Sequence, residues 1–68
     1  MSEIIFVVED EPEGGFLARA VGESIFTQAE TLEELRAQVR DAVQYHFEGA
    51  AAPGLMRLHF VRDEVIAA

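Results

Sequence analysis

The chain has no cysteine, no lysine and no apolar run long enough to span a membrane. Without cysteine it forms neither a disulfide nor a thiolate metal site. Without an apolar span or a signal-peptide pattern, we interpret it as a cytoplasmic protein that makes no membrane contact. Its 68 residues are expected to form one domain, and a domain of this size buries only roughly 60% of its unfolded surface. We therefore expect homo-oligomerisation to supply further stability.

Basic side chains are also scarce. The sequence has 13 aspartates and glutamates against 5 arginines, which gives a formal net charge of −8 at pH 7. A surface this negative repels phosphate backbones and attracts basic proteins. We therefore expect no direct binding to nucleic acid, and we expect any protein partner to be basic.

Five consecutive apolar residues at positions 4–8, Ile-Ile-Phe-Val-Val, predict a strand that is covered on both faces, because successive side chains of a strand point to opposite sides. Pro12, Gly14 and Gly15 supply a turn after this strand. Alternating apolar residues between turn residues predict three more strands. The four expected strands are residues 3–9, 16–21, 24–28 and 55–62.

The segment from Thr31 onward has the clearest helical pattern. Thr31 is the expected N-cap and Glu34 the third helical residue of a capping box, in which each side chain accepts the backbone N–H of the other residue. Gly49 is the expected end of the helix. The apolar stripe of this helix consists of Leu32, Leu35, Val39, Ala42, Val43, His46 and Phe47.

These elements predict an α+β domain of order β-β-β-α-β. If the chain reverses at each connection, the helix carries it back so that the last strand runs parallel to the first, and the two can lie side by side. The first strand then lies inside a mixed four-stranded sheet, which agrees with its continuous apolar run. The single helix packs on one face of this sheet.

Period-two alternation divides the strands between two faces. Phe6, Phe16, Met56, Leu58 and Phe60 are expected under the helix. The opposite face is expected to be an interface with a partner or with another subunit, where positive groups meet acidic or aromatic residues. The residues expected there are Ile5, Val7, Leu17, Arg19, Val21, Arg57, His59 and Val61.

Residues 11–47 read EPEGGFLARAVGESIFTQAETLEELRAQVRDAVQYHF. An acidic Gly-Gly turn, a strand ending near Ala-Arg, another near Thr-Gln and a helix opened by Thr-Leu-Glu-Glu-Leu follow one another. This arrangement resembles the N-terminal domain of HicB-type antitoxins. The resemblance implies a partial ribonuclease-H-like sheet with one helix. It also implies a non-enzymatic role, the binding and blocking of a small basic HicA-like toxin that cleaves RNA.

Two features differ from that family. Residues 21–25 read Val-Gly-Glu-Ser-Ile, where the family commonly has a Leu-Pro-Gly-Cys loop. The family often continues into a DNA-binding domain, which is not expected here. The chain therefore resembles a stand-alone form of the toxin-binding domain.

A catalytic alternative rests on carboxylates that follow the strands or begin the helix. Ribonuclease-H-like nucleases hold two metal ions with carboxylates from comparable elements. We instead expect solvated charges, because a nuclease also needs a basic groove for its substrate. The acidic pole in question comprises Glu9, Asp10, Glu33, Glu34, Asp63 and Glu64.

The two histidines predict no metal site. His46 lies on the helix stripe and His59 on the strand face away from the helix, so we expect them on different sides of the sheet. There is no zinc-type ligand spacing. We therefore expect no cofactor, no metal and no enzymatic activity, and we interpret His46 as a histidine at the edge of the core.

Two hypotheses remain open. The first is an interaction module of antitoxin type that binds a basic HicA-like toxin. The second is a self-assembling structural domain, a homo-oligomer without a toxin partner. A neighbouring gene that encodes a small basic protein would favour the first.

Overall fold

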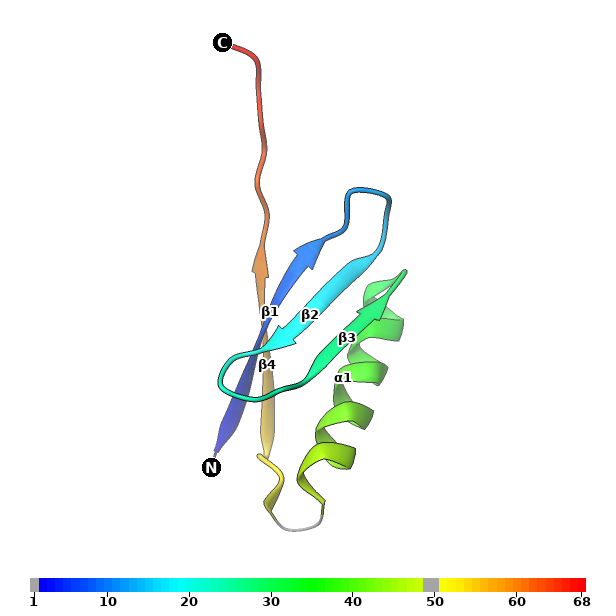
Figure 1. The fold of residues 1–68 in the computed structure, drawn as a ribbon, viewed down its shortest axis with the longest axis vertical. Coiled ribbons are helices and arrows are strands. Elements are labelled where there is room, and N and C mark those ends of the chain that lie inside the picture. Colours follow the sequence, from blue (N-terminus) through cyan, green and yellow to red (C-terminus); the bar gives the residue numbers. More distant parts are fainter. Residues whose placement is uncertain (1, 49–50) are drawn as a thin grey trace.

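The computed structural model describes residues 2–48 and 51–68 and contains four strands and one helix (Figure 1). The strands and helix follow the predicted order. Their bounds are β1 Glu3–Asp10, β2 Phe16–Ala20, β3 Phe26–Ala29, α1 Leu32–Phe47 and β4 Leu55–Val61.

The four strands form one mixed sheet in the order β3-β2-β1-β4. β1 pairs antiparallel with β2 and parallel with β4, and β2 pairs antiparallel with β3. The predicted α+β fold, with β1 inside the sheet and α1 as the connection to β4, is therefore confirmed. Five of the predicted strand limits were wrong by one or two residues, and β1 ends at Asp10 instead of Glu9. β2 ends at Ala20, β3 covers Phe26–Ala29 and β4 ends at Val61.

The turn between β1 and β2 depends on glycine, as predicted. Gly14 and Gly15 have φ angles of 105° and 90°, which side chains rarely adopt. The Gly14 N–H donates to the Glu11 carbonyl at 3.0 Å, and the Glu11 N–H donates to the Gly15 carbonyl at 3.0 Å. A Cβ on Gly15 would lie 2.8 Å from the Ala29 carbonyl oxygen, so glycine also permits the close approach to β3.

The helix begins as predicted, with one difference in the cap. The Glu34 N–H donates to the Thr31 hydroxyl at 3.1 Å, which satisfies one of the free N–H groups of the first turn. The Glu34 carboxylate accepts from the Thr31 hydroxyl at 3.3 Å, where a capping box would have it accept from the Thr31 backbone. At the other end, Glu48 has φ 49° and donates its N–H to the Gln44 carbonyl. The predicted terminator Gly49 lies outside the described residues.

The core lies between α1 and one face of the sheet. Phe6 and Val8 from β1 and Leu35 from α1 are fully buried, and Val39 and Val43 are nearly so. The remaining buried apolar residues of this cluster are Ile4, Ala18, Ala20, Ile25 and Ala29.

The helix covers this face unevenly, because α1 packs over β3 and β2 and lies away from β4. Met56 and Leu58 on β4 are therefore only partly buried. The prediction that Phe60 lies under the helix was wrong, since its side chain is 51% exposed at the edge of the sheet. Beyond β4, residues 62–68 extend in line with the strand and away from the sheet (Figure 1).

Within residues 2–48 and 51–68, no helix is both long and apolar enough to cross a membrane.

Candidate functional site

The face of the sheet that points away from α1 carries the predicted interface residues. We call this surface the open face. Val7 lies at its centre, between Arg19 on β2 and His59 on β4. The other predicted residues surround this row in the order that the strand register sets. They are Ile5, Leu17, Val21, Arg57 and Val61.

The register explains how these residues come together. Leu17 and Val61 flank Glu9, and Arg57 lies beside Ile5. Val21 follows the end of β2, and its N–H donates to the Ile5 carbonyl at 2.9 Å, so it continues the same surface. All eight predicted residues thus lie on one face, and residues far apart in the chain become neighbours.

Sequence reasoning missed two large apolar residues of the open face, Phe26 and Leu55, and Leu55 on β4 lies beside Glu3 with 50% of its surface exposed. Phe26 on β3 lies opposite Arg19 and is 61% exposed. Its neighbours Ile25 and Thr27 are buried on the other side. Alternation within residues 25–29 could have identified it, because Ile25, Thr27 and Ala29 share one face and leave Phe26 on the other.

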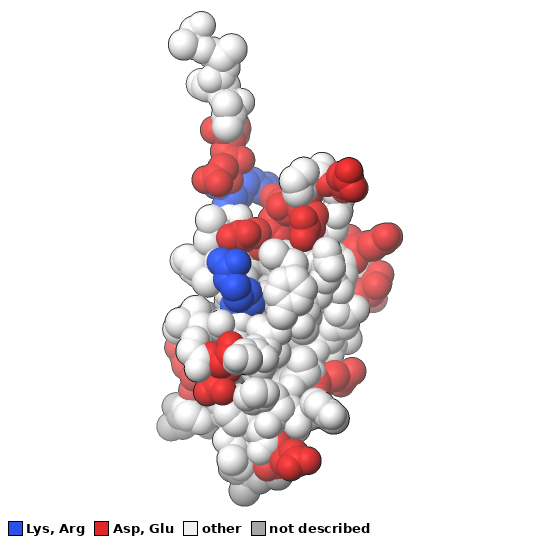
Figure 2. Space-filling view, in the orientation of Figure 1, with Lys and Arg blue, Asp and Glu red and all other residues white. Residues whose placement is uncertain are grey.

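The open face carries apolar side chains around Val7, which we call its apolar centre, together with charged ones: Arg19 and His59 flank Val7, and Glu9 lies on the same face of β1. Val7 and Leu17 are partly buried by neighbouring side chains, whereas Ile5 and Val21 are exposed. In the space-filling view, acidic side chains lie mainly toward the edges of the body, and basic side chains interrupt the uncharged surface between them (Figure 2). Among residues 2–48 and 51–68, no helix covers this apolar centre.

The arginines of the open face are paired with carboxylates of the same face. Arg57 donates from Nε and Nη2 to the two carboxylate oxygens of Glu3, both at 3.0 Å. Arg19 lies 3.5 Å from Glu9. Both arginines therefore already have a carboxylate of the same chain beside them, and their contact with acidic or aromatic residues of another chain stays a prediction.

The Glu3–Arg57 pair also changes the acidity of its members. The hydrogen bonds from Arg57 lower the pKa of Glu3, against a smaller opposing effect of desolvation. The same contact raises the pKa of Arg57. Both groups are exposed at the rim of the face, so the pair holds β1 to β4 without a large energetic contribution.

The carboxylates of the predicted acidic pole are not all brought together. Glu9, Asp10 and Asp63 line a hollow with Val61 and Arg62. Arg62 donates to Asp10 at 2.8 Å, which raises the pKa of Arg62. The remaining pole residues, Glu33, Glu34 and Glu64, do not line this hollow. In the parts of the chain that the structure describes, no three histidine or carboxylate side chains lie close enough to share a metal ion.

The two histidines lie on different sides of the sheet. His59 is on the open face beside Val7. His46, on α1, has its Nε2 3.0 Å from the Glu23 carboxylate, and its ring packs edge-on against Phe47 with centroids 5.0 Å apart. His46 is exposed, and it contacts the core through Phe47, which packs against the buried cluster.

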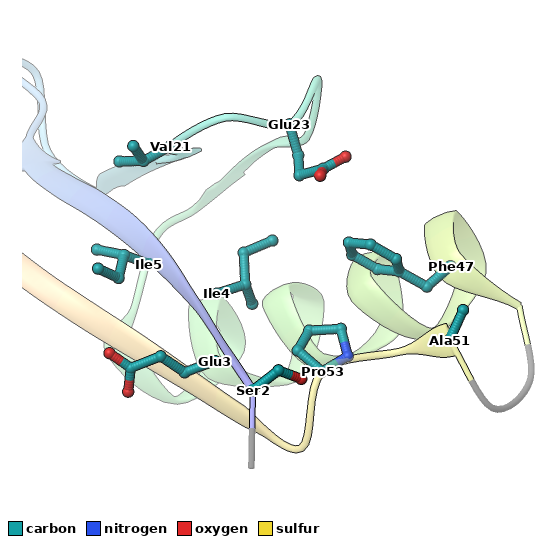
Figure 3. Close-up of a pocket in the computed structure, with 9 residues that line it drawn as sticks. All are labelled: Ser2, Glu3, Ile4, Ile5, Val21, Glu23, Phe47, Ala51 and Pro53. Carbon is teal, nitrogen blue, oxygen red and sulfur yellow. The ribbon is translucent and has the colours of Figure 1, made fainter.

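A hollow of about 340 Å³ opens at the end of the sheet near the C-terminus of α1 (Figure 3). Ile4, Phe47 and Pro53 surround it, and the Glu23 and Glu3 carboxylates lie on opposite sides. Both carboxylates already have partners, His46 and Arg57. The described residues of the hollow therefore present an apolar wall with two carboxylates that are already paired.

Two relatives carry the name UPF0150 protein. One, from Archaeoglobus fulgidus, is 56% identical over 52 residues, which cover 76% of this chain and 77% of the relative. The other, from Thermotoga maritima, is 40% identical over 65 residues, which cover 96% of this chain and 91% of the relative. The chain belongs to the UPF0150 family.

No family model matches the UPF0150 chain, and no solved structure does either. The name UPF0150 states no activity.

Proposed function

We propose that this UPF0150 chain is a non-enzymatic protein-interaction module that resembles the toxin-binding domain of HicB-type antitoxins. Its partner in this proposal is a small basic HicA-like protein, and the binding surface is the open face. The observation that carries the proposal is the uncovered apolar centre of that face around Val7. Soluble monomers seldom leave contiguous apolar surface uncovered unless it binds something.

Charge favours a basic partner. The chain has a net charge of −8, and the Glu3 and Glu9 carboxylates lie at the margin of the apolar centre. Their present partners, Arg57 and Arg19, are exposed, so cationic side chains of another protein can share the same carboxylates. Apolar contact at the centre with polar pairs at the rim is the usual arrangement of a protein interface.

The proposal includes no catalytic step. Glu3, Glu9 and Asp10 each form a surface ion pair with an arginine, and we propose none of them as a general base. His59 has Val7 and Arg57 near it on the open face. Masking the partner's own surface is the action that this arrangement supports.

The test is a search of the neighbouring genes for a small basic HicA-like protein, followed by titration calorimetry of the chain with that protein. We expect binding, and we expect Val7→Lys to weaken it by roughly tenfold or more, because a cation replaces apolar contact in front of a basic partner. Gln38→Lys is the matched control. It adds the same charge on the exposed side of α1 and should leave binding nearly unchanged. Equal weakening by both variants, or no binding by the unaltered chain, would contradict the proposal.

Self-assembly without a toxin is the second candidate. The observation that favours it is the uncovered edge of β4, which is a different surface from the open face.

A further inference from the structure

β4 is the last strand on its side of the sheet, and its outer edge is free among the strands that the structure describes. The Leu55 N–H points inward, because it donates to the Ser2 carbonyl next to β1. Backbone groups alternate along a strand, so the N–H and C=O groups of Met56, Leu58 and Phe60 point outward. Such a row is a template for another strand.

Side chains on both sides of β4 are also incompletely covered. On the open face Leu55 is 50% exposed, and on the helix side Phe60 is 51% exposed. A groove between β4 and α1 is lined by Met56 and Leu58 together with residues of the helix. The helical residues are Arg36, Val39 and Arg40.

The two arginines of this groove give it a charge preference. Neither Arg36 nor Arg40 forms an ion pair with any residue of 2–48 or 51–68. The groove thus combines an apolar floor with positive charge at its border. An extended segment with alternating acidic and apolar residues would fit it.

The segment that follows β4 has this composition. Residues 63–66 read Asp-Glu-Val-Ile, and Val65 and Ile66 are 94% and 78% exposed. The segment is extended in line with β4 (Figure 1). In strand alternation, Asp63 and Val65 belong to the open face, and Glu64 and Ile66 to the helix side. Each face thus receives one acidic and one apolar residue.

We propose that two copies of the chain pair antiparallel through β4 and the segment that follows it, with Phe60 opposite Phe60 of the second copy. In this register Arg57 lies opposite Asp63 of the second copy. Leu55 lies opposite Val65 of the second copy. Glu64 of the second copy lies opposite Met56, on the groove side, within reach of the long side chains of Arg36 and Arg40.

The register follows from symmetry and charge. A two-fold axis perpendicular to the sheet keeps each residue on its own face, so an odd-numbered residue must face an odd-numbered one. The next permitted register places Val61 opposite itself, and it sets Arg57 against Val65 and Phe60 against Arg62. Centring on Phe60 instead pairs unlike charges with each other and apolar residues with each other, as cross-strand pairs prefer.

The resulting dimer has one continuous sheet of eight strands, four from each copy. The axis lies at the β4 edge, so the apolar centre around Val7 stays uncovered on both copies. Self-association through β4 is therefore independent of whether the open face binds a basic protein.

A disulfide test uses the absence of cysteine from the chain. Leu55→Cys/Val65→Cys should form a covalent dimer on mild oxidation, because a closely spaced cross-strand pair has Cα atoms about 4.5 Å apart. Within one extended chain the two positions are roughly 33 Å apart, so an intramolecular bond is excluded. Leu55→Cys/Glu64→Cys is the matched control, whose cysteines point to opposite faces, and its cross-linking should be at least tenfold slower.

Light scattering behind a sizing column provides a second measurement. The unaltered chain should elute as a dimer at micromolar concentration. Phe60→Pro removes an outward N–H, so this variant should elute as a monomer and remain folded by circular dichroism. Val61→Pro removes an inward N–H that pairs with β1, so this variant should unfold. A monomeric unaltered chain, an intramolecular disulfide, or equal cross-linking of the two cysteine pairs would overturn the proposal. Binding of a basic protein would be unaffected by any of these results.

Discussion

The two faces of β1 have the same kind of side chain and very different surroundings. Phe6 and Val8 are fully buried under α1, whereas Ile5 is 36% exposed on the open face. The difference comes from the single helix, which covers one side of the sheet only. An apolar residue on one face contributes to folding, and in our proposal its neighbour on the other face contributes to binding.

The edges of the sheet differ in a similar way. On the β3 side, Thr27 and Ala29 are buried against α1. On the β4 side, the helix is farther away and Phe60 is half exposed. A single 16-residue helix is too narrow to cover four strands, so one edge remains available.

The largest expected effect is loss of Phe6. Phe6→Ala should lower the free energy of unfolding by about 3–5 kcal/mol, because it leaves a cavity between β1 and α1. Ile5→Ala on the open face should cost about 1 kcal/mol or less, since the side chain is already partly solvated. Urea unfolding followed by circular dichroism measures both. Equal losses would mean that the two faces of β1 are equally important for folding.

A smaller effect of opposite sign is expected at Thr27, the one buried polar side chain on the helix-covered face of the described sheet. Its hydroxyl has no hydrogen-bond partner within residues 2–48 and 51–68. Thr27→Val keeps the shape and removes the unsatisfied group, so stability should rise by about 1 kcal/mol. Thermal unfolding should show the higher midpoint. A lower midpoint for Thr27→Val would show that the hydroxyl is satisfied in solution.

The smallest effect concerns the Glu3–Arg57 pair on the open face. The pKa of Glu3 is lowered by Arg57, so the folded state favours the ionised carboxylate. The stabilisation that the ionised Glu3 gives the folded state is fully present above the ordinary glutamate pKa of about 4.3. It is lost as the pH falls through the lowered pKa that Glu3 has in the folded state. The unfolding free energies of the unaltered chain and Glu3→Gln should thus differ slightly at pH 7 and converge at more acidic pH. A constant difference down to pH 2 would contradict this.

Most of the fold was predictable from local patterns. Each of three predicted features depends on residues that are close together in the sequence, and each occurs as expected. These features are the Thr31 N-cap, the apolar stripe through Leu35, Val39 and Val43, and the Gly14-Gly15 turn. Assignment of the eight interface residues to one face followed from alternation, because a strand has only two faces.

The position of α1 across the sheet and the pairing of charges needed the tertiary structure. Helical periodicity shows which side of α1 is buried but not which strands it covers, so the exposure of Phe60 could not be anticipated. Arg57 and Glu3 are 54 positions apart, and only the parallel register of β4 on β1 brings their side chains together. Local sequence thus determined the elements and their faces, whereas the packing of distant elements decided which apolar residues and which edge stayed uncovered.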